Sequence, residues 1–537
     1  MIGSLATALE RRPLYRWRLS RSPETAARLW RDHGGPAALR GLGWLLMAGL
    51  LGLFIGFSVA VLPMQMVMVP ASVVILLVGM VFWGLPDLPR VPARLTVRLF
   101  YVAVATSLVL PTYLAFDLPG LPWISVIRIT ASAALLGFAI CYCASSAVRA
   151  EVADVAAADP VLVRLALCVL GAFALSIPLS MAIAASFTVL MNALIHWYFP
   201  FFCCLFVLRS HRNLAAFFRL LVACTIVTVL VAGLEFHLER RVFLDLVPQS
   251  LVDQNPTLQN IWRQQIRNGM YRASANFLVP LSYGEYLALA APFCLFFIFH
   301  PVRRSDFVLG FAAFLLVLAG TVLCGARVGF VGVIVSCAAF AVLYALRLVR
   351  RKGSSLVGSM LLALLPIGLM SVPALLITSR RFYNMVLGGG ETAASTGARF
   401  VQWELAMPRI VENPLTGHGL GMGAAIVGYA GSRGQLSVDS YVLSLITETG
   451  LLGLCAFVVM LGWAVWRGAS IYATPDREGS AFAGPIAAAL CGFMVTRLVL
   501  SQLENHTLVF ILLGTLVVVA RYLGPVPGEG PRRGIAP

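Results

Sequence analysis

Residues 307–346 read FVLGFAAFLLVLAGTVLCGARVGFVGVIVSCAAFAVLYAL, two long apolar runs separated by a single charged residue, Arg327. A helix that crosses a lipid bilayer needs about 20 mainly apolar residues. Each half of this stretch meets that requirement. The stretch therefore predicts two membrane-spanning helices joined by a tight turn, CGAR.

The composition of the whole chain agrees with a membrane location. Of 537 residues, 60% are hydrophobic and 12% are charged, and the mean hydropathy is +0.88. A soluble domain is typically about a quarter charged. The net charge of +17 would suggest nucleic acid in a soluble protein. Here the basic residues lie between apolar runs, which favours membrane topology and anionic lipid, and we expect no nucleic-acid partner.

Apolar runs of spanning length recur along the chain. They lie near 43–62, 65–84, 99–117, 122–145, 161–183, 186–208, 214–235, 278–299, 307–325, 328–348, 355–377, 440–466, 482–500 and 506–523. The fold class predicted is all-α, a polytopic transmembrane helix bundle of about 12–14 spans with two long extracytoplasmic loops.

The positive-inside rule gives an orientation independently of hydropathy. With the N-terminus placed in the cytoplasm, the basic residues of the short connections fall on the inside. These residues are Arg90, Arg94, Arg98, Arg149, Arg164, Arg209, Arg212, Arg303, Arg304, Arg347, Arg350, Arg351, Lys352, Arg467 and Arg477. The same orientation puts both long polar interruptions, 236–277 and 378–439, outside.

The outer loops also contain arginines, which need another explanation. Arg272 lies in the first loop, Arg399 in the second, and Arg327 in the turn between two helices. Guanidinium groups bind phosphate with paired donors, so these residues would suit a lipid diphosphate. The alternative is that long loops tolerate any charge, and that these arginines contact lipid phosphates nonspecifically.

The second loop contains the most specific pattern. Residues 397–423, GARFVQWELAMPRIVENPLTGHGLGMG, indicate a short helix followed by a glycine-rich turn. Residues 438–454, VDSYVLSLITETGLLGL, open a membrane helix. Glycines allow a backbone to adopt positive φ and to approach a ligand closely.

This pattern resembles the O-antigen ligase/polymerase superfamily, membrane proteins that share a Wzy-type C-terminal motif. The shared positions are Arg399, Trp403, Pro414, Gly417, Gly419, Gly421, Tyr441, Glu448, Gly450 and Gly453. Two shorter stretches, YRASANFLVP and CGARVGF, also resemble segments of the family. The strong resemblance covers roughly 397–455.

The resemblance implies an inverting glycosyl transfer that uses no metal, nucleotide or other cofactor. The donor would be a glycan on polyprenyl diphosphate, and the implied diphosphate clamp is Arg272, Arg327 and Arg399. The other substrate-binding residues expected are Trp403, Gly417, Gly419, Tyr441 and Glu448. The expected partners are the lipid-linked glycan, membrane lipid, a chain-length regulator and a flippase.

The sequence departs from the family where ligases have a histidine, because Asp439 stands there. This favours a polymerase or a divergent member. Asp439 is a candidate general base, or only the N-cap of the following helix. His418 is the other candidate base, or a structural residue of its loop. Glu448 would line an outward cavity or form a structural ion pair, and Arg128, Glu285 and Arg497 are further charges within apolar runs.

The function predicted is polymerisation of lipid-linked repeat units into exopolysaccharide or O-antigen on the periplasmic face of the bacterial inner membrane. One alternative is a ligase that moves a glycan onto a lipid or protein. The other is a flippase, although no paired repeat is evident.

The resemblance and the topology together divide the chain. The predicted order is a basic cytoplasmic tail (1–42), N-terminal transmembrane helices (43–235), a first periplasmic loop (236–277), central transmembrane helices (278–377), a large periplasmic loop with catalytic motifs (378–439), C-terminal transmembrane helices (440–523) and a cytoplasmic tail (524–537).

Overall fold

The computed structural model describes most of the chain beyond residue 90. The described residues are 91–116, 124–247, 266–267, 270–352, 393–431, 434–474 and 479–521, with a few positions between 356 and 378. The predicted spans 43–62 and 65–84, and most of 355–377, lie outside them, as do both predicted tails.

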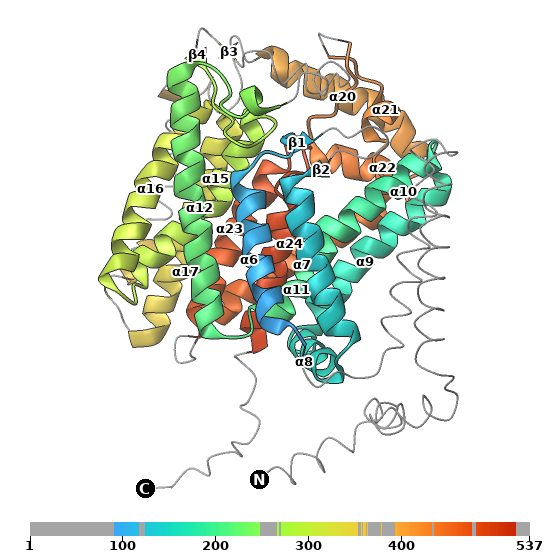
Figure 1. Cartoon of the computed structure of the whole chain (residues 1–537). Coiled ribbons are helices and arrows are strands. Elements are labelled where there is room, and N and C mark those ends of the chain that lie inside the picture. The colour runs from blue at the N-terminus through green and yellow to red at the C-terminus, as the bar shows by residue number, and fades with distance from the viewer. Residues whose placement is uncertain are drawn as a thin grey trace, which may run out of the picture.

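The described chain is a bundle of helices (Figure 1). The α-helices are α6 (Ala93–Val109), α7 (Val126–Cys143), α8 (Ser146–Ala156), α9 (Pro160–Ser176), α10 (Ile183–Ala193), α11 (Phe199–Val207), α12 (His211–Leu238), α15 (Pro280–Phe299), α16 (Arg304–Cys324), α17 (Arg327–Lys352), α20 (Ala393–Glu412), α21 (Gly423–Val427), α22 (Tyr441–Tyr472), α23 (Ala483–Thr496) and α24 (His506–Arg521).

Short elements complete the description. They are the 3₁₀ helices η1 (Ile177–Leu179), η3 (Leu244–Leu246) and η5 (Ser480–Phe482), the π-helix η2 (Leu194–Tyr198), and the antiparallel pairs β1 (Ala115–Phe116) with β2 (Ile124–Ser125) and β3 (Ile266–Arg267) with β4 (Met270–Tyr271).

Eight helices among the described residues are long and apolar enough to cross a membrane. They are Val126–Cys143, Pro160–Leu179, Ile183–Val207, His211–Leu238, Pro280–Phe299, Arg304–Cys324, Arg327–Arg351 and Tyr441–Tyr472. Two shorter apolar helices, Ser480–Thr496 and His506–Arg521, accompany them. The all-α, polytopic prediction is confirmed, and the figure of 12–14 spans stays a prediction.

The two predicted helices within 307–346 form as expected. The helix α16 ends at Cys324, and Gly325 caps it with φ of 57°, a left-handed conformation that glycine adopts without strain. The helix α17 begins two residues later at Arg327. The tight turn between two spans is therefore confirmed.

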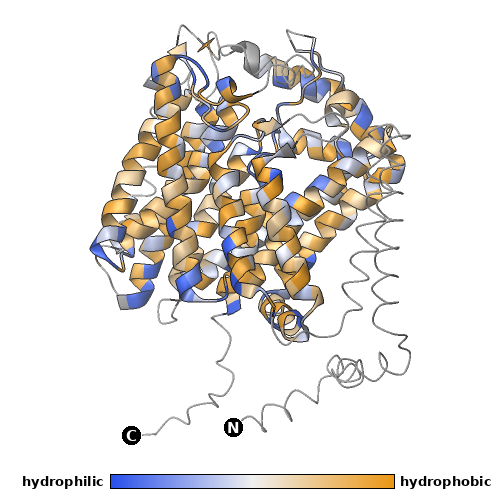
Figure 2. Cartoon of the chain, in the orientation of Figure 1, coloured by the Kyte–Doolittle hydropathy of each residue, from blue (hydrophilic) through white to orange (hydrophobic). Residues whose placement is uncertain are grey.

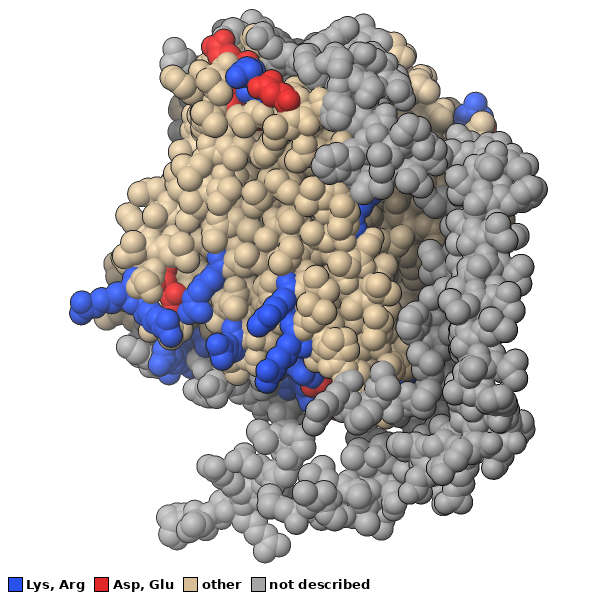
Figure 3. Space-filling model, viewed as in Figure 1, with Lys and Arg blue, Asp and Glu red and all other residues tan. Residues whose placement is uncertain are grey.

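The bundle has two distinct ends. The strand pairs, α20 and α21 lie at one end, and α8 lies at the other (Figure 1). Apolar residues cover the length between them (Figure 2). Lysine and arginine side chains on the visible face gather at the end that holds α8 (Figure 3). This asymmetry is the one that the positive-inside rule describes.

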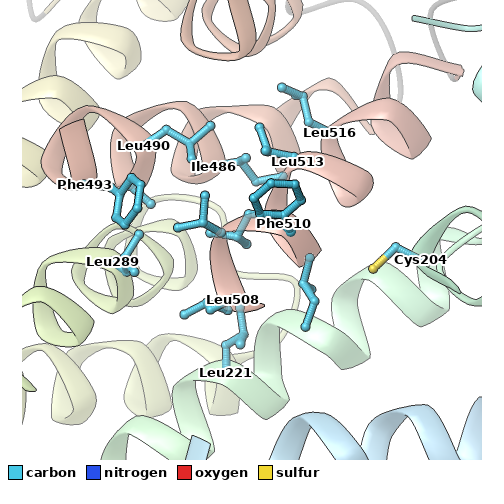
Figure 4. Close-up of a cluster of buried hydrophobic side chains, with 14 of the residues drawn as sticks. Cys204, Leu221, Leu289, Ile486, Leu490, Phe493, Leu508, Phe510, Leu513 and Leu516 are labelled. Atoms are coloured by element: carbon cyan, nitrogen blue, oxygen red, sulfur yellow. The ribbon is translucent and has the colours of Figure 1, made fainter. Parts of the chain in front are cut away.

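The helix α15 is central and α16 is peripheral. The buried share of the apolar window is 89% for α15 and 33% for α16. Backbones approach closely in the centre, since a Cβ on Gly284 of α15 would lie 2.9 Å from the Cα of Gly329 in α17. Small residues allow this kind of contact in membrane bundles. The side chains of α23 and α24 pack beside α15 in a continuous apolar core (Figure 4).

Candidate functional site

The glycine-rich turn is built into a break in α22. This helix is interrupted at Gly450, whose φ is 65° and ψ −165°. The amides of His418 and Gly419 donate to the carbonyls of Thr447 and Glu448, each at 2.9 Å. After the break, further amides donate back to the turn, with Leu451 N to Pro414 O at 2.8 Å and Leu452 N to Leu415 O at 3.2 Å. The turn thus satisfies backbone groups that the break would otherwise leave unpaired.

Two glycines make this interlocking possible. A Cβ on Gly417 would lie 2.4 Å from the carbonyl carbon of Glu448, and one on Gly450 would lie 2.3 Å from that of Leu415. Both glycines also have φ of 65°. No other residue type fits at either position without moving backbone, which gives the family's glycine pattern a physical cause.

Glu448 anchors the same turn. One carboxylate oxygen accepts the amide of Gly421 at 2.8 Å, and the other accepts the amide of Gly423 at 3.2 Å and the Ser444 hydroxyl at 2.6 Å. None of the ion pairs formed within the described ranges includes this carboxylate. The expected ion pair is therefore not found there, and Glu448 positions the backbone of the turn.

Asp439 lies at the start of α22, directly across from α20. Its Oδ2 atom is 3.9 Å from Nε of Arg399, and its amide donates to Oε1 of Gln402 at 2.9 Å. The side chains of both Arg399 and Asp439 are half-buried, with 26% and 38% exposed. Nε of Arg399 is itself buried and has no hydrogen-bond partner among the described residues.

Asp439 is not the N-cap of α22, so that interpretation is wrong. Ser440 takes this position, and its hydroxyl accepts the amide of Leu443 at 3.4 Å. The sequence offers Asp439 as a cap because aspartate is common at this position. Because the serine does the capping, the carboxylate of Asp439 is left for Arg399.

The helix α20 is amphipathic, and this places its functional residues. Ala406 is buried in a small cluster with Val427, Val438 and Leu443, which docks α20 against α21 and α22. Gln402 is buried on the same side, one turn before it. Trp403 is 37% exposed and lies on the outer surface of α20.

Both ring nitrogens of His418 contact the end of α20 or the residue just after it. Nε2 is 2.7 Å from the carbonyl of Arg409, and Nδ1 is 3.3 Å from Nδ2 of Asn413. These partners favour Nε2 as donor and Nδ1 as acceptor. The ring ties the end of α20 to the glycine turn, which favours the structural role. The role of His418 as a base stays a prediction.

Arg272 and Arg327 belong to the α16–α17 turn. Nε of Arg272 donates to the carbonyl of Cys324 at 3.2 Å, and the amide of Ala273 donates to Leu323 at 3.0 Å. Arg327 is the first residue of α17. Two arginines from separate parts of the sequence therefore meet at one turn, at the same end of the bundle as α20 (Figure 1).

The segment that carries Arg272 is fixed from both sides. Oε2 of Glu235 accepts the amides of Ser274 and Ala275 at 3.1 and 2.8 Å. The buried guanidinium of Arg241 donates to the carbonyls of Phe277 and Leu278 at 3.1 and 2.8 Å. Arg241, one of the outer-loop arginines, thus has a structural role that local sequence does not signal.

Glu285 and Arg497, two of the charged residues within the apolar runs, form an ion pair next to the start of α22. Nε of Arg497 donates to Glu285 at 2.8 Å, and Asn505 and Thr496 bind the same carboxylate at 2.9 and 2.6 Å. The carbonyl of Arg497 accepts the amide of Tyr441 at 3.1 Å. Tyr441 is buried.

A cavity of about 470 Å³ lies next to this network. Its polar lining includes Arg128, Asn192, His196, Gln502 and Glu504. Of these residues only Arg128 was flagged from sequence, because the others come from elements far apart in the chain. Within the described ranges, no group of three His, Cys, Asp or Glu side chains could hold a metal ion.

Residues 312–458 match the family model described as O-antigen ligase. This part of the chain is similar to the O-antigen ligase family. The matched range of this O-antigen ligase domain runs from α16 into α22, and it includes Arg327, Arg399, His418, Asp439 and Glu448. The resemblance based on 397–455 is confirmed. No curated protein matches the chain.

The family match gives the chain a membrane function of O-antigen ligase or polymerase type. Its substrates are accordingly a lipid-linked glycan and membrane lipid. Arg272 and the residues that line the cavity lie outside the matched range.

Proposed function

We propose that the protein polymerises polyprenyl-diphosphate-linked repeat units into exopolysaccharide or O-antigen. The observation that carries the proposal is the carboxylate of Asp439 at 3.9 Å from Arg399, at the position where ligases of the family have a histidine. Ser440 supplies the helix cap, so capping does not account for Asp439.

In the reaction, a hydroxyl of the acceptor sugar attacks the anomeric carbon of the donor glycan. The bond from this carbon to the diphosphate oxygen breaks, and the bonding electrons leave with the diphosphate. Attack from the opposite side inverts the anomeric configuration. Asp439 takes the hydroxyl proton as general base, a role that typically contributes about 10²–10⁴-fold in rate.

Arg399 would stabilise the departing diphosphate. Its Nε is too far from Asp439 for a hydrogen bond. A substrate oxygen could therefore bind this donor without displacing a protein partner. Arg272 and Arg327 would extend the clamp from the α16–α17 turn, since cations aimed at developing negative charge stabilise the transition state. The proposed substrate site is completed by Trp403, Gly417, Gly419, Tyr441 and Glu448. Glu448 contributes by fixing the backbone of the glycine turn.

The proposed location is the bacterial inner membrane, with both termini in the cytoplasm and the active site on the periplasmic face. The asymmetry of basic side chains supports this orientation, because cytoplasmic connections carry an excess of lysine and arginine. A flippase would deliver the donor, and a chain-length regulator would set the length of the product.

A ligase is the second candidate, because the matched family model is described as O-antigen ligase. It would transfer a finished glycan to a lipid or protein acceptor by the same chemistry. A flippase is the third candidate. Transporters often have broken helices, but the break in α22 is filled by the chain's own glycine turn.

The test is incubation of the purified protein with polyprenyl-diphosphate repeat units, followed by a gel of the products. A ladder of lengthening glycans, lost in Arg399→Ala, is expected. Arg409→Ala is the matched control, because Arg409 is an exposed arginine of the same helix that pairs with Glu412. Transfer only after a lipid or protein acceptor is added would indicate a ligase. An intact donor under both conditions would contradict glycosyl transfer.

A further inference from the structure

The cavity next to the Arg497 network has the size and the lining of a ligand site. Its volume of about 470 Å³ lies within the usual range for ligand pockets, about 300–1,000 Å³. Its walls come from the ends of α6, α7 and α24, from α10 with the π-helix η2, and from the α23–α24 connection. Single-turn π-helices occur frequently at functional sites.

Glu504 presents an unused acceptor in this cavity. Its Oε1 atom accepts the amide of Leu278 at 2.8 Å, which fixes the carboxylate. Its Oε2 atom is buried, and although the Ser282 hydroxyl lies close to this carboxylate, neither atom makes a hydrogen bond of normal geometry in the part of the chain that the structure describes. Buried polar atoms are normally paired, so this oxygen points to a ligand that brings a donor.

The charge balance of the lining selects the class of ligand. Arg128 and Glu504 contribute one positive and one negative side chain, and Asn192 and Gln502 add neutral amides. A diphosphate would meet an unpaired carboxylate, which costs free energy through like-charge repulsion. A neutral sugar instead offers hydroxyls that donate to the carboxylate and accept from the amides and the guanidinium. Trp197 in the wall, stacked on His506 at 4.7 Å, offers a fixed aromatic surface.

Two walls of the cavity are hydrogen-bonded to neighbouring segments, one to the residue before Asp439 and the other to the glycine turn. The hydroxyl of Ser501, next to the lining residue Gln502, donates to the carbonyl of Val438, which precedes Asp439. On the other side, α10 supplies Ser186, whose hydroxyl donates to the carbonyl of Leu420 in the glycine turn at 2.7 Å. A ligand in the cavity would therefore lie beside the segment that holds Asp439.

We propose that this cavity binds a neutral sugar unit of the acceptor glycan, with Oε2 of Glu504 accepting one of its hydroxyls. The proposal rests on the proposed function, because it assigns the acceptor to a place in the same site. Glu504 is a binding residue in this account, and the proton of the attacking hydroxyl goes to Asp439.

The test is a binding measurement that needs no turnover. The probe is the oligosaccharide released by mild acid from the lipid-linked repeat units, titrated by calorimetry into the full-length protein in lipid nanodiscs. Glu504→Gln is expected to weaken binding by about tenfold or more, as loss of a charge-assisted hydrogen bond does. Gln502→Ala, which alters an exposed lining residue, is expected to weaken binding less. Glu412→Gln is the control, a glutamate on the outer surface of α20.

Binding of the oligosaccharide by wild type and Asp439→Asn, but not by Glu504→Gln, would support the proposal. Equal affinity in wild type, Glu504→Gln and Gln502→Ala would overturn it, as would competition by inorganic diphosphate. If wild type binds no oligosaccharide but still consumes the lipid-linked donor, the acceptor site is wrong and the glycosyltransferase proposal stands. Thermal unfolding of each variant checks that the fold is retained.

Discussion

Two turns lie at the same end of the bundle, one between α16 and α17 and the other after α20, and they are built in opposite ways. The α16–α17 turn is a short link in which Gly325 caps one helix and Arg327 begins the next. Nothing crowds Gly325, since the nearest atom to an added Cβ would be Cγ of Arg272 at 3.4 Å. The glycine turn after α20 instead exchanges four backbone hydrogen bonds with the broken helix α22. The first turn relies on a neighbouring segment to bring Arg272 to it, whereas the second relies on close backbone contact.

This difference predicts unequal sensitivity to added methyl groups, and here we expect the largest effect. Gly450→Ala should abolish glycan transfer, a loss of more than about 100-fold, because its Cβ would lie 2.3 Å from backbone carbon. Gly325→Ala should cost only about 1 kcal/mol, the usual penalty of the left-handed conformation. Transfer assays with thermal unfolding measure both. Wild-type activity in Gly450→Ala would show that the turn and the helix are not interlocked.

Adjacent residues at the start of α22 should separate catalysis from stability. Asp439→Asn is expected to lower transfer by about 10²–10⁴-fold with little change in thermal stability. Ser440→Ala is expected to cost about 1 kcal/mol of stability, because it removes the helix cap, and to keep most of the activity. Reversed effects of the two substitutions on activity and stability would return Asp439 to a capping role.

His418 should behave as a loop anchor. His418→Ala is expected to lower transfer by less than about tenfold, since it removes two neutral hydrogen bonds between the turn and α20. The pH profile of the remaining activity should keep the shape of the wild-type profile. A loss of transfer as large as that expected for Asp439→Asn would instead identify His418 as the base.

The sequence predicts well what depends on local pattern. The runs that became α16 and α17 and their CGAR turn follow from hydropathy and charge alone. The glycine pattern located the turn, but not its place inside a broken helix. The break in α22 at Gly450 lies against Leu415, which is 35 positions earlier in the sequence. The cap was ambiguous because Asp439 and Ser440 are both good capping residues. The cavity left no local signal, since Asn192, His196 and Glu504 are ordinary polar residues until the helices bring them together.

The last effect, one that depends on pH, is expected from Glu504, which lies outside both turns. Burial raises its pKa to about 7 from 4.5. The Ser282 hydroxyl, the Leu278 amide and the charge of Arg241 oppose this rise, and the charge of Glu285 adds to it, while Arg128 and His196 line the same cavity. A raised pKa gives stability that is complete below pH 4.5 and is lost as the pH rises through 7. Glu504→Gln should therefore gain stability over wild type, by up to about 3 kcal/mol above pH 7, because each unit of pKa difference is worth about 1.36 kcal/mol. Unfolding midpoints at pH 5 and 8 measure this, and an equal difference at both values would contradict the raised pKa.

The most direct test of glycosyl transfer at Asp439 is a gel of the products formed from the lipid-linked repeat unit alone, by wild type and by Asp439→Asn. The account predicts a ladder of lengthening glycans with wild type, and no ladder with a variant that retains wild-type thermal stability. A full ladder from Asp439→Asn would contradict the assigned base, and donor that stays intact with wild type, even with a lipid or protein acceptor added, would contradict the reaction itself.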